Sequence, residues 1–219
     1  MNKKSFLTTF CGCAILLVAI SSTFAQELKP IQLPKAQMDG GKPLMQALKD
    51  RKSARTFSVE KLPMQTLANM LWAACGINRP DLGQRTAPSA MNRQEIDIYV
   101  ATVDGLYLYN AKANELEPIV TGDIRALTGR QPFVAEAPVN LVFVTDYSKM
   151  GERMGDDQKD FYSAADTGFI SENVYLYCAS EGLSTVVRAT IDKPALAKAM
   201  KLRPDQKVIL SQTVGYPKK

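Results

Sequence analysis

The sequence contains no histidine and only four cysteines among its 219 residues. Without histidine the chain cannot build a Ser-His-Asp triad, a Cys-His pair or a His-ligated metal centre. Two of the cysteines fall within the first 13 residues, which leaves too few thiolates elsewhere for a structural zinc site. Any acid–base chemistry must therefore use Asp, Glu, Lys, Tyr, water or a cofactor, which excludes most secreted hydrolases and zinc enzymes.

Long apolar runs are also scarce, and the clearest one lies near the N-terminus. Lys3 and Lys4 precede an apolar stretch over residues 10–20, and small residues lead to a plausible cleavage site after Ala25. The stretch is shorter than the about 20 residues that a membrane span needs. The pattern predicts a secretory signal peptide over residues 1–25 and a bacterial protein that is periplasmic or secreted, with no stable membrane insertion after cleavage. An uncleaved N-terminal anchor is the alternative.

A strong excess of either charge sign is missing as well. The net charge is +5, and removal of the signal peptide would take away two lysines and no acidic residue. The remaining excess is small and evenly spread, and the basic residues are not interleaved with aromatic ones. We therefore expect no nucleic-acid partner.

The two cysteines beyond the signal peptide are Cys75 and Cys178. An oxidising compartment would permit a disulfide between them. Both lie in apolar stretches with helical periodicity, however, and buried free thiols typically occur in such surroundings. Free thiols are the favoured interpretation, and the disulfide stays open.

Periodicity and breakers predict one α+β domain over residues 43–219, after a lead-in over residues 26–42 that carries prolines and glycines. Hairpin pairing beside several helices, without strict alternation of strands and helices, favours a mostly antiparallel sheet flanked by helices. Helices are expected over residues 43–48, 63–76, 119–129, 160–182 (long and largely buried) and 193–200. Strands are expected over residues 96–103, 106–109, 139–145, 185–189 and 208–214, and residues 77–94 are expected to form a loop.

A first candidate motif occupies residues 51–57, directly after the first helix. Arg51, Ser53 and Arg55 alternate, so an extended backbone would point all three side chains the same way. Two guanidinium groups and a hydroxyl suit a phosphate group. The competing interpretation is a solvated charge run at a helix C-terminus, where cations are favourable in any case.

Two further segments are candidates for ligand contact. Residues 85–94 join a buried helix to a strand and carry small and polar side chains, which fits either a loop lying against a flat polar ring or an ordinary surface loop. Residues 179–185 end the long helix at Gly182. A terminating glycine explains that segment without any ligand, although a backbone N–H there would also suit a ligand acceptor.

Taken in order, these segments resemble the FMN-dependent nitroreductase family. The matching stretches are Arg-x-Ser-x-Arg-x-Phe at 51–57, the Leu-Trp-Ala-Ala-x-Gly-Ile-Asn-Arg-Pro run ending at Pro80, and Arg-Thr-Ala-Pro-Ser-Ala-x-Asn at 85–92. Ala-Pro-Val at 137–139, Glu-Gly-Leu at 181–183 and Gly-Tyr-Pro at 215–217 follow. The resemblance covers residues 43–217 and is greatest to the branch of peptide-heterocycle (thiazoline/oxazoline) dehydrogenases.

The resemblance implies a homodimer that binds FMN between its subunits. It places the phosphate and ribityl chain at Arg51, Lys52, Ser53 and Arg55, with Lys218 or Lys219 completing the phosphate site. It also implies that Pro88, Ser89 and Asn92 approach the flavin ring from the partner subunit. The backbone of Glu181, Gly182 and Leu183 would face the N5 edge of the ring. No side chain is identified as catalytic, because the cofactor carries the redox chemistry.

The function expected from the resemblance is an exported oxidoreductase that transfers a hydride through flavin N5 to or from a small organic substrate. The alternative is a non-catalytic protein with the same fold that binds flavin or another small ligand. Export makes this alternative relevant, since pyridine nucleotides are scarce outside the cytoplasm. The sequence names neither the substrate nor the electron donor.

Overall fold

The computed structural model describes residues 28–218, so the predicted signal peptide and Lys219 lie outside the described residues. A seven-stranded, entirely antiparallel sheet forms the centre, in the order β1-β6-β5-β4-β7-β9-β8. Its strands are β1 (Ile31–Gln32), β4 (Ile96–Ala101), β5 (Gly105–Asn110), β6 (Glu115–Thr121), β7 (Val139–Asp146), β8 (Ser184–Arg188) and β9 (Gln206–Gly215). The predicted α+β class with an antiparallel sheet is confirmed.

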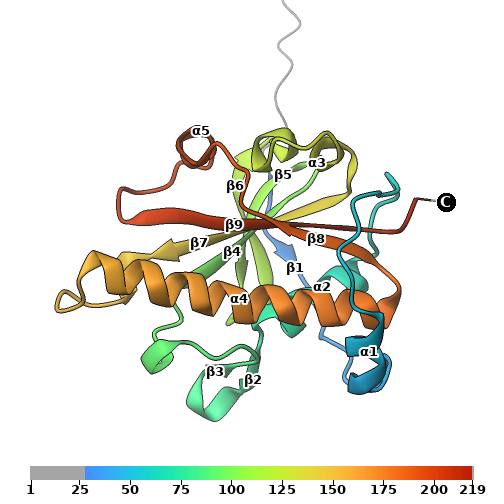
Figure 1. Ribbon diagram of the computed structural model, residues 1–219, viewed down its shortest axis with the longest axis horizontal. Coiled ribbons are helices and arrows are strands. Elements are labelled where there is room, and N and C mark those ends of the chain that lie inside the picture. Colours follow the sequence, from blue (N-terminus) through green and yellow to red (C-terminus); the bar gives the residue numbers. More distant parts are fainter. Residues whose placement is uncertain (1–27, 219) are drawn as a thin grey trace, which may run out of the picture.

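Helices cover both faces of this sheet (Figure 1). The long α4 (Asp156–Glu181) crosses one face beside α1 (Leu44–Asp50) and α2 (Met64–Cys75). The short α3 (Phe133–Glu136) and α5 (Lys193–Ala199) lie on the opposite face. Each face has its own apolar core, the larger one under α2 and α4 and the smaller one under α5.

The central strand β7 shows why this arrangement is stable. All eight of its residues are buried, and it pairs with β4 on one side and β9 on the other. A strand covered on both faces favours apolar residues in succession, and Leu141–Val144 form such a run inside the strand predicted over residues 139–145. The strands predicted over residues 96–103 and 106–109 are present as β4 and β5, joined by a turn at Asp104-Gly105.

Three sequence predictions differ from the structure. The helix predicted over residues 119–129 is wrong: β6 continues to Thr121, and only a 3-10 turn follows over Arg125–Thr128. Pro118 inside β6 disguised the strand, and it sits next to a register shift in the pairing with β5. Residues 77–94 are not simply a loop, because β2 (Ile77–Arg79) and β3 (Gln84–Arg85) pair with each other.

The third difference concerns α4, which was expected to be largely buried. Its buried face is rich in small and polar residues, while Phe161 and Phe169 on the outer face are 69% and 49% exposed. Ala164 and Gly168 lie on the same outward side, one and two turns from Phe161. The helix therefore presents an apolar stripe to the outside of the single chain.

The lead-in is an integral part of the domain. It pairs with β6 through β1, buries Leu33, and ends against the C-terminal end of α4. There Gly41 adopts a positive φ of 85°, and a Cβ at this position would lie 2.6 Å from the Ser180 hydroxyl. Only glycine fits this close approach without strain.

Both cysteines are buried and free, which confirms the favoured interpretation. Within residues 28–218 no helix combines the length and the apolar character that a membrane crossing requires.

Candidate cofactor site

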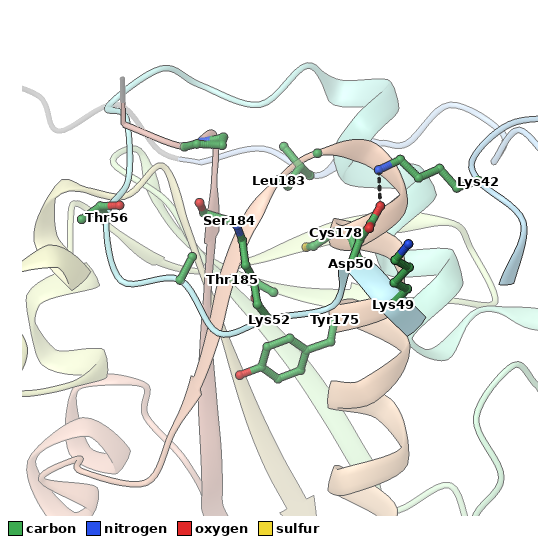
Figure 2. Close-up of a pocket in the computed structure, with 14 residues that line it drawn as sticks. Lys42, Lys49, Asp50, Lys52, Thr56, Tyr175, Cys178, Leu183, Ser184 and Thr185 are labelled. Carbon is green, nitrogen blue, oxygen red and sulfur yellow. Dashed lines mark hydrogen bonds and ion pairs between the residues drawn. The ribbon is translucent and has the colours of Figure 1, made fainter. Parts of the chain in front are cut away.

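A cavity of about 600 Å³ opens where three segments meet: residues 52–56, the C-terminal end of α4 and the start of β8 (Figure 2). Its volume lies within the range of small-molecule sites. The lining combines cationic, hydroxyl and apolar side chains: Lys42, Lys49, Asp50, Lys52, Ala54, Thr56, Tyr175, Cys178, Ala179, Gly182, Leu183, Ser184, Thr185 and Pro217.

Backbone hydrogen bonds hold the segment after α1 against the edge of the sheet. The N–H of Ala54 donates to the carbonyl of Thr185 at 2.9 Å, and the N–H of Ser58 donates to the carbonyl of Tyr216 at 2.9 Å. Phe57 between them is buried. The segment thus continues the sheet beyond β8 without forming a regular strand, and this fixes which of its side chains face the cavity.

The side chains that face the cavity are the opposite set from the one that alternation predicted. Lys52 is in the cavity lining, as are its alternate neighbours Ala54 and Thr56, whereas Arg51, Ser53 and Arg55 are not among the lining residues. The extended backbone was expected correctly. The side that faces the cavity depends on the pairing of Ala54 with Thr185, which the sequence does not show.

Arg51 and Ser53 nevertheless converge, because both contact Tyr175 of α4. The Ser53 hydroxyl lies 2.8 Å from the Tyr175 hydroxyl, which also accepts the N–H of Val187 at 2.9 Å. The Arg51 guanidinium lies over the tyrosine ring, 5.3 Å from its centroid. Tyr175 belongs to the cavity lining and joins three segments, yet the sequence motifs gave no indication of its role.

The charge around the cavity favours an anion. Lys42 pairs with Asp50 at 2.8 Å, and this hydrogen bond lowers the pKa of the Asp50 carboxyl (Figure 2). Four further cations have no ion-pair partner in the described part of the chain: Lys49, Arg51, Lys52 and Arg55. Unpaired cations beside a cavity attract anionic ligands.

The end of α4 forms one wall of the cavity. Gly182 adopts the left-handed conformation, and the N–H groups of Gly182 and Leu183 both donate to the Cys178 carbonyl. This capping occupies the N–H groups of the two residues whose backbone was expected to face the ligand. The Glu181 carboxylate is exposed beside Gly41. Burial raises the pKa of the Cys178 thiol, so it lines the wall as a neutral group.

Pro88, Ser89 and Asn92 lie in a different part of the domain. Their loop packs against the middle of α4, where the N–H of Ala90 donates to Asp166 at 2.9 Å. Asp166 and Glu181 are separated by roughly 20 Å along the helix, at about 1.5 Å per residue. A single subunit therefore does not bring this loop to the cavity, which leaves the partner subunit as the only source for such a contact.

The residues at the cavity fit a phosphorylated ligand with a flat polar ring. The unpaired cations and the hydroxyls of Thr56 and Ser184 supply donors for phosphate and hydroxyl oxygens. Leu183 and Pro217 supply apolar surface. Lys218 is exposed and follows Pro217 directly, so it extends the cationic rim.

Comparison with known proteins gives a consistent result. Residues 48–216 match the sequence profile of the nitroreductase family. One similar crystal structure is that of a candidate nitroreductase from Ralstonia eutropha JMP134. It is 44% identical to this chain, with a TM-score of 0.83 over 87% of this chain and 90% of that chain. A candidate nitroreductase of Methanocaldococcus jannaschii is 31% identical over 147 residues, which are 62% of this chain and 73% of the relative.

A more distant structure shows only the same fold. The NADPH:FMN oxidoreductase of Vibrio harveyi, solved in complex with NAD+, is 19% identical, with a TM-score of 0.61 over 80% of this chain and 69% of that chain. The profile match spans most of the described domain, and it includes the cavity segment, the end of α4 and β9. The chain belongs to the nitroreductase family.

Proposed function

We propose that this protein is an exported FMN-dependent oxidoreductase, active as a homodimer on a small organic substrate. The observation that carries the proposal is the cavity beside Tyr175, where Lys49 and Lys52 line hydroxyl and apolar surface and Arg51 lies over the tyrosine ring. Oxidoreductase activity mediated by flavin is general in the nitroreductase family, to which residues 48–216 belong. An anionic, ring-bearing cofactor matches both the charge and the shape of this cavity.

The chain's own groups have distinct tasks in this proposal. Lys52, which lines the cavity, would hold the phosphate, and Arg51 and Arg55 of the same segment would reach it from beside the lining, with Ser53 donating to one of its oxygens. Lys218 adds charge at the open end of the cavity. Bound FMN supplies the hydride chemistry at N5, which none of the lining side chains can provide.

The second subunit has a specific place in the site. Ser89 and Asn92 lie too far along α4 to reach the cavity of their own chain, and the exposed Phe161 and Phe169 of the apolar stripe lie on either side of Asp166 along α4, where the loop is held. Burial of this apolar stripe in a homodimer would remove it from water. Small residues at Ala164 and Gly168 would allow two α4 helices to approach closely. The dimer would then deliver the loop over residues 88–92 to the partner's flavin.

Export is supported by the sequence of residues 1–25 alone. The basic start lacks an arginine pair, so we infer transport of the unfolded chain, with FMN acquired afterwards. The narrower relation to the peptide-heterocycle dehydrogenases remains part of the proposal. It fits a compartment in which a substrate or a protein partner, rather than a pyridine nucleotide, supplies the hydride.

The purified mature protein tests the proposal directly. We expect a yellow protein whose released chromophore has the mass and spectrum of FMN. Dithionite should bleach it anaerobically, and a nitroaromatic or quinone acceptor should restore the colour in repeated turnovers. A colourless protein that gains no flavin on incubation with FMN would reject FMN binding. A yellow protein that no acceptor reoxidises faster than free FMN would instead support the non-catalytic alternative.

A further inference from the structure

The loop that follows β3 is held in an unusual backbone conformation. Met91, Asn92 and Gln94 have φ values of 52°, 53° and 51°, so three non-glycine residues within four positions occupy the left-handed region. Each such residue costs on the order of 1 kcal/mol or more and persists only where its surroundings impose it. The loop therefore depends on specific contacts.

Two sets of contacts hold the loop in place. Inside it, the Ser89 hydroxyl accepts the backbone N–H of Gln94 at 3.0 Å. The Gln94 side-chain amide donates to the side-chain oxygen Oδ1 of Asn92, also at 3.0 Å. From outside, one carboxylate oxygen of Asp166 accepts the N–H of Ala90 at 2.9 Å. Asp166 is 3% exposed, and its hydrogen bond with Ala90 attaches the loop to α4.

A second buried acid is a neighbour of Asp166. Glu95, the residue before β4, is fully buried, and neither of its carboxyl oxygens has a hydrogen-bond donor within residues 28–218. Burial raises the pKa of the Glu95 carboxyl, and the neighbouring Asp166 carboxyl raises it further. Two ionised carboxylates in such surroundings would repel each other, and neither could donate.

A single proton on one of the two carboxyl groups would remove this repulsion and supply a donor. One carboxylate oxygen of Asp166 accepts the N–H of Ala90, and the carboxylate has further lone pairs that can accept another hydrogen bond. A proton on Glu95 then makes that group neutral, which suits its burial, and turns it into a donor toward Asp166. Asp166 would accept one hydrogen bond from Glu95 and one from Ala90, so the protonated glutamic acid fixes the orientation of the aspartate that grips the loop.

We propose that Glu95 and Asp166 form a buried acid pair with one shared proton, and that this pair positions the loop over residues 89–94. The inference rests on the proposed function in one respect: the loop matters for activity because it would carry Ser89 and Asn92 to the partner's flavin. Glu95 and Asp166 are positioning residues, since neither touches the cavity of its own chain.

The pair makes the loop sensitive to pH. Burial, together with the neighbouring Asp166, raises the pKa of Glu95 to about 7. The other titratable groups facing it are Lys149, which is held by Asp97 at 2.6 Å, and the Cys75 thiol of α2. A carboxyl group whose pKa is raised by folding stabilises the fold fully at pH values below its ordinary pKa. That contribution is lost as the pH rises through about 7.

Glu95→Gln is the decisive variant, because it keeps the shape and the donor of the protonated acid. Affinity for FMN should be measured by flavin fluorescence from about pH 6 to about pH 8.5, with both proteins at each pH, because the FMN phosphate itself titrates near pH 6. We expect equal dissociation constants at the acidic end. At the alkaline end the wild type should bind about tenfold more weakly than Glu95→Gln. Exposed Glu60→Gln should follow the wild type throughout.

Hydrogen exchange at the Ala90 amide provides a readout that needs no flavin. Relative to Glu95→Gln, the wild-type amide should lose protection above about pH 7. Asp166→Asn, whose amide oxygen still accepts from Ala90, should preserve protection, and Asp166→Ala should abolish it. Identical pH profiles for wild type and Glu95→Gln in the exchange experiment would overturn the acid pair. A protein that binds no FMN at any pH would overturn the proposed function, while exchange at Ala90 would still decide the acid pair.

Discussion

The hydroxyl groups of Ser53 and Tyr175 lie 2.8 Å apart, although the residues are separated by 122 positions in the sequence. The tyrosine hydroxyl accepts the N–H of Val187, which leaves its own proton to donate. If that proton goes to Ser53, the serine accepts from the tyrosine and keeps its own proton free. The serine would then be free to donate to an anion, so in the proposed site Tyr175 would orient the hydroxyl assigned to the phosphate.

Replacement of Tyr175 by phenylalanine should weaken FMN binding by about five- to tenfold, which corresponds to one lost hydrogen bond of about 1 kcal/mol. Tyr177→Phe, on the same helix as Tyr175, is the matched control, because the Tyr177 hydroxyl donates to the Thr66 carbonyl of α2 and not to the segment beside the cavity. Titration of both apo-proteins with FMN measures the difference. Equal losses in the two variants would contradict a specific role for Tyr175.

The double variant Arg51→Ala with Arg55→Ala should lose FMN on dialysis, with affinity reduced by about 100-fold or more. Removal of two cations from a phosphate site costs charge-assisted hydrogen bonds. The pair Lys112→Ala with Lys198→Ala removes the same charge from exposed positions and should retain flavin. Full retention by the arginine variant would refute the assignment of the phosphate site.

Phe161→Asp with Phe169→Asp should convert a dimer into a monomer, because charge on the exposed stripe of α4 opposes its burial between subunits. Light scattering during size exclusion gives the mass, and absorbance near 450 nm gives the bound flavin, as is usual for oxidised flavins. We expect flavin to be lost with the dimer. Val103→Asp, at another exposed apolar position, should remain dimeric. A yellow wild-type monomer would contradict flavin binding between subunits.

The two thiols should be inaccessible in the folded protein. Burial raises the pKa of both Cys75 and Cys178, so neither forms a thiolate readily at pH 8. A thiol reagent should therefore label neither residue in native protein and both after denaturation, without prior reduction. Labelling that appears only after reduction of the denatured protein would instead indicate a disulfide.

Reduction by a pyridine nucleotide should be slow. Anaerobic stopped-flow mixing of the holo-protein with NADH at micromolar concentration should leave the flavin oxidised for minutes, while dithionite bleaches it at once. The reason is the expected compartment, in which NADH and NADPH are scarce. Rapid reduction by NADH would show that this protein retains the use of pyridine nucleotides.

The elements with a clear local signal were predictable from the sequence. Pro43 and Pro63 mark the starts of α1 and α2, and Gly182 marks the end of α4. The stretch Leu141–Val144 of β7 is continuously apolar because that strand is covered on both faces. In contrast, Pro118 concealed β6, since a proline inside a strand is tolerated only beside an irregularity of pairing.

The candidate site was predictable in its segments but not in its contacts. Ordered motifs led to residues 51–57 and 181–183, yet the pairing of Ala54 with Thr185 decides which side chains face the cavity. Tyr175 was missed because a tyrosine inside an apolar helix has the pattern of an ordinary core residue. Glu95 and Asp166 were missed because their proximity joins a strand to a helix 71 positions later, and nothing local announces it.

The position of β9 has a consequence for the order in which this molecule matures. β9 is the last of the described strands, but it lies between β7 and β8, and within residues 28–218 β9 is the only strand of the sheet that pairs with β8. Ser184 and Thr185 of β8 form part of the cavity wall. This wall cannot assemble until β9 is in place, so under the proposed export a chain whose β9 has not yet crossed the membrane would lack the proposed cofactor site. Truncation within β9 would leave a protein that never closes its sheet.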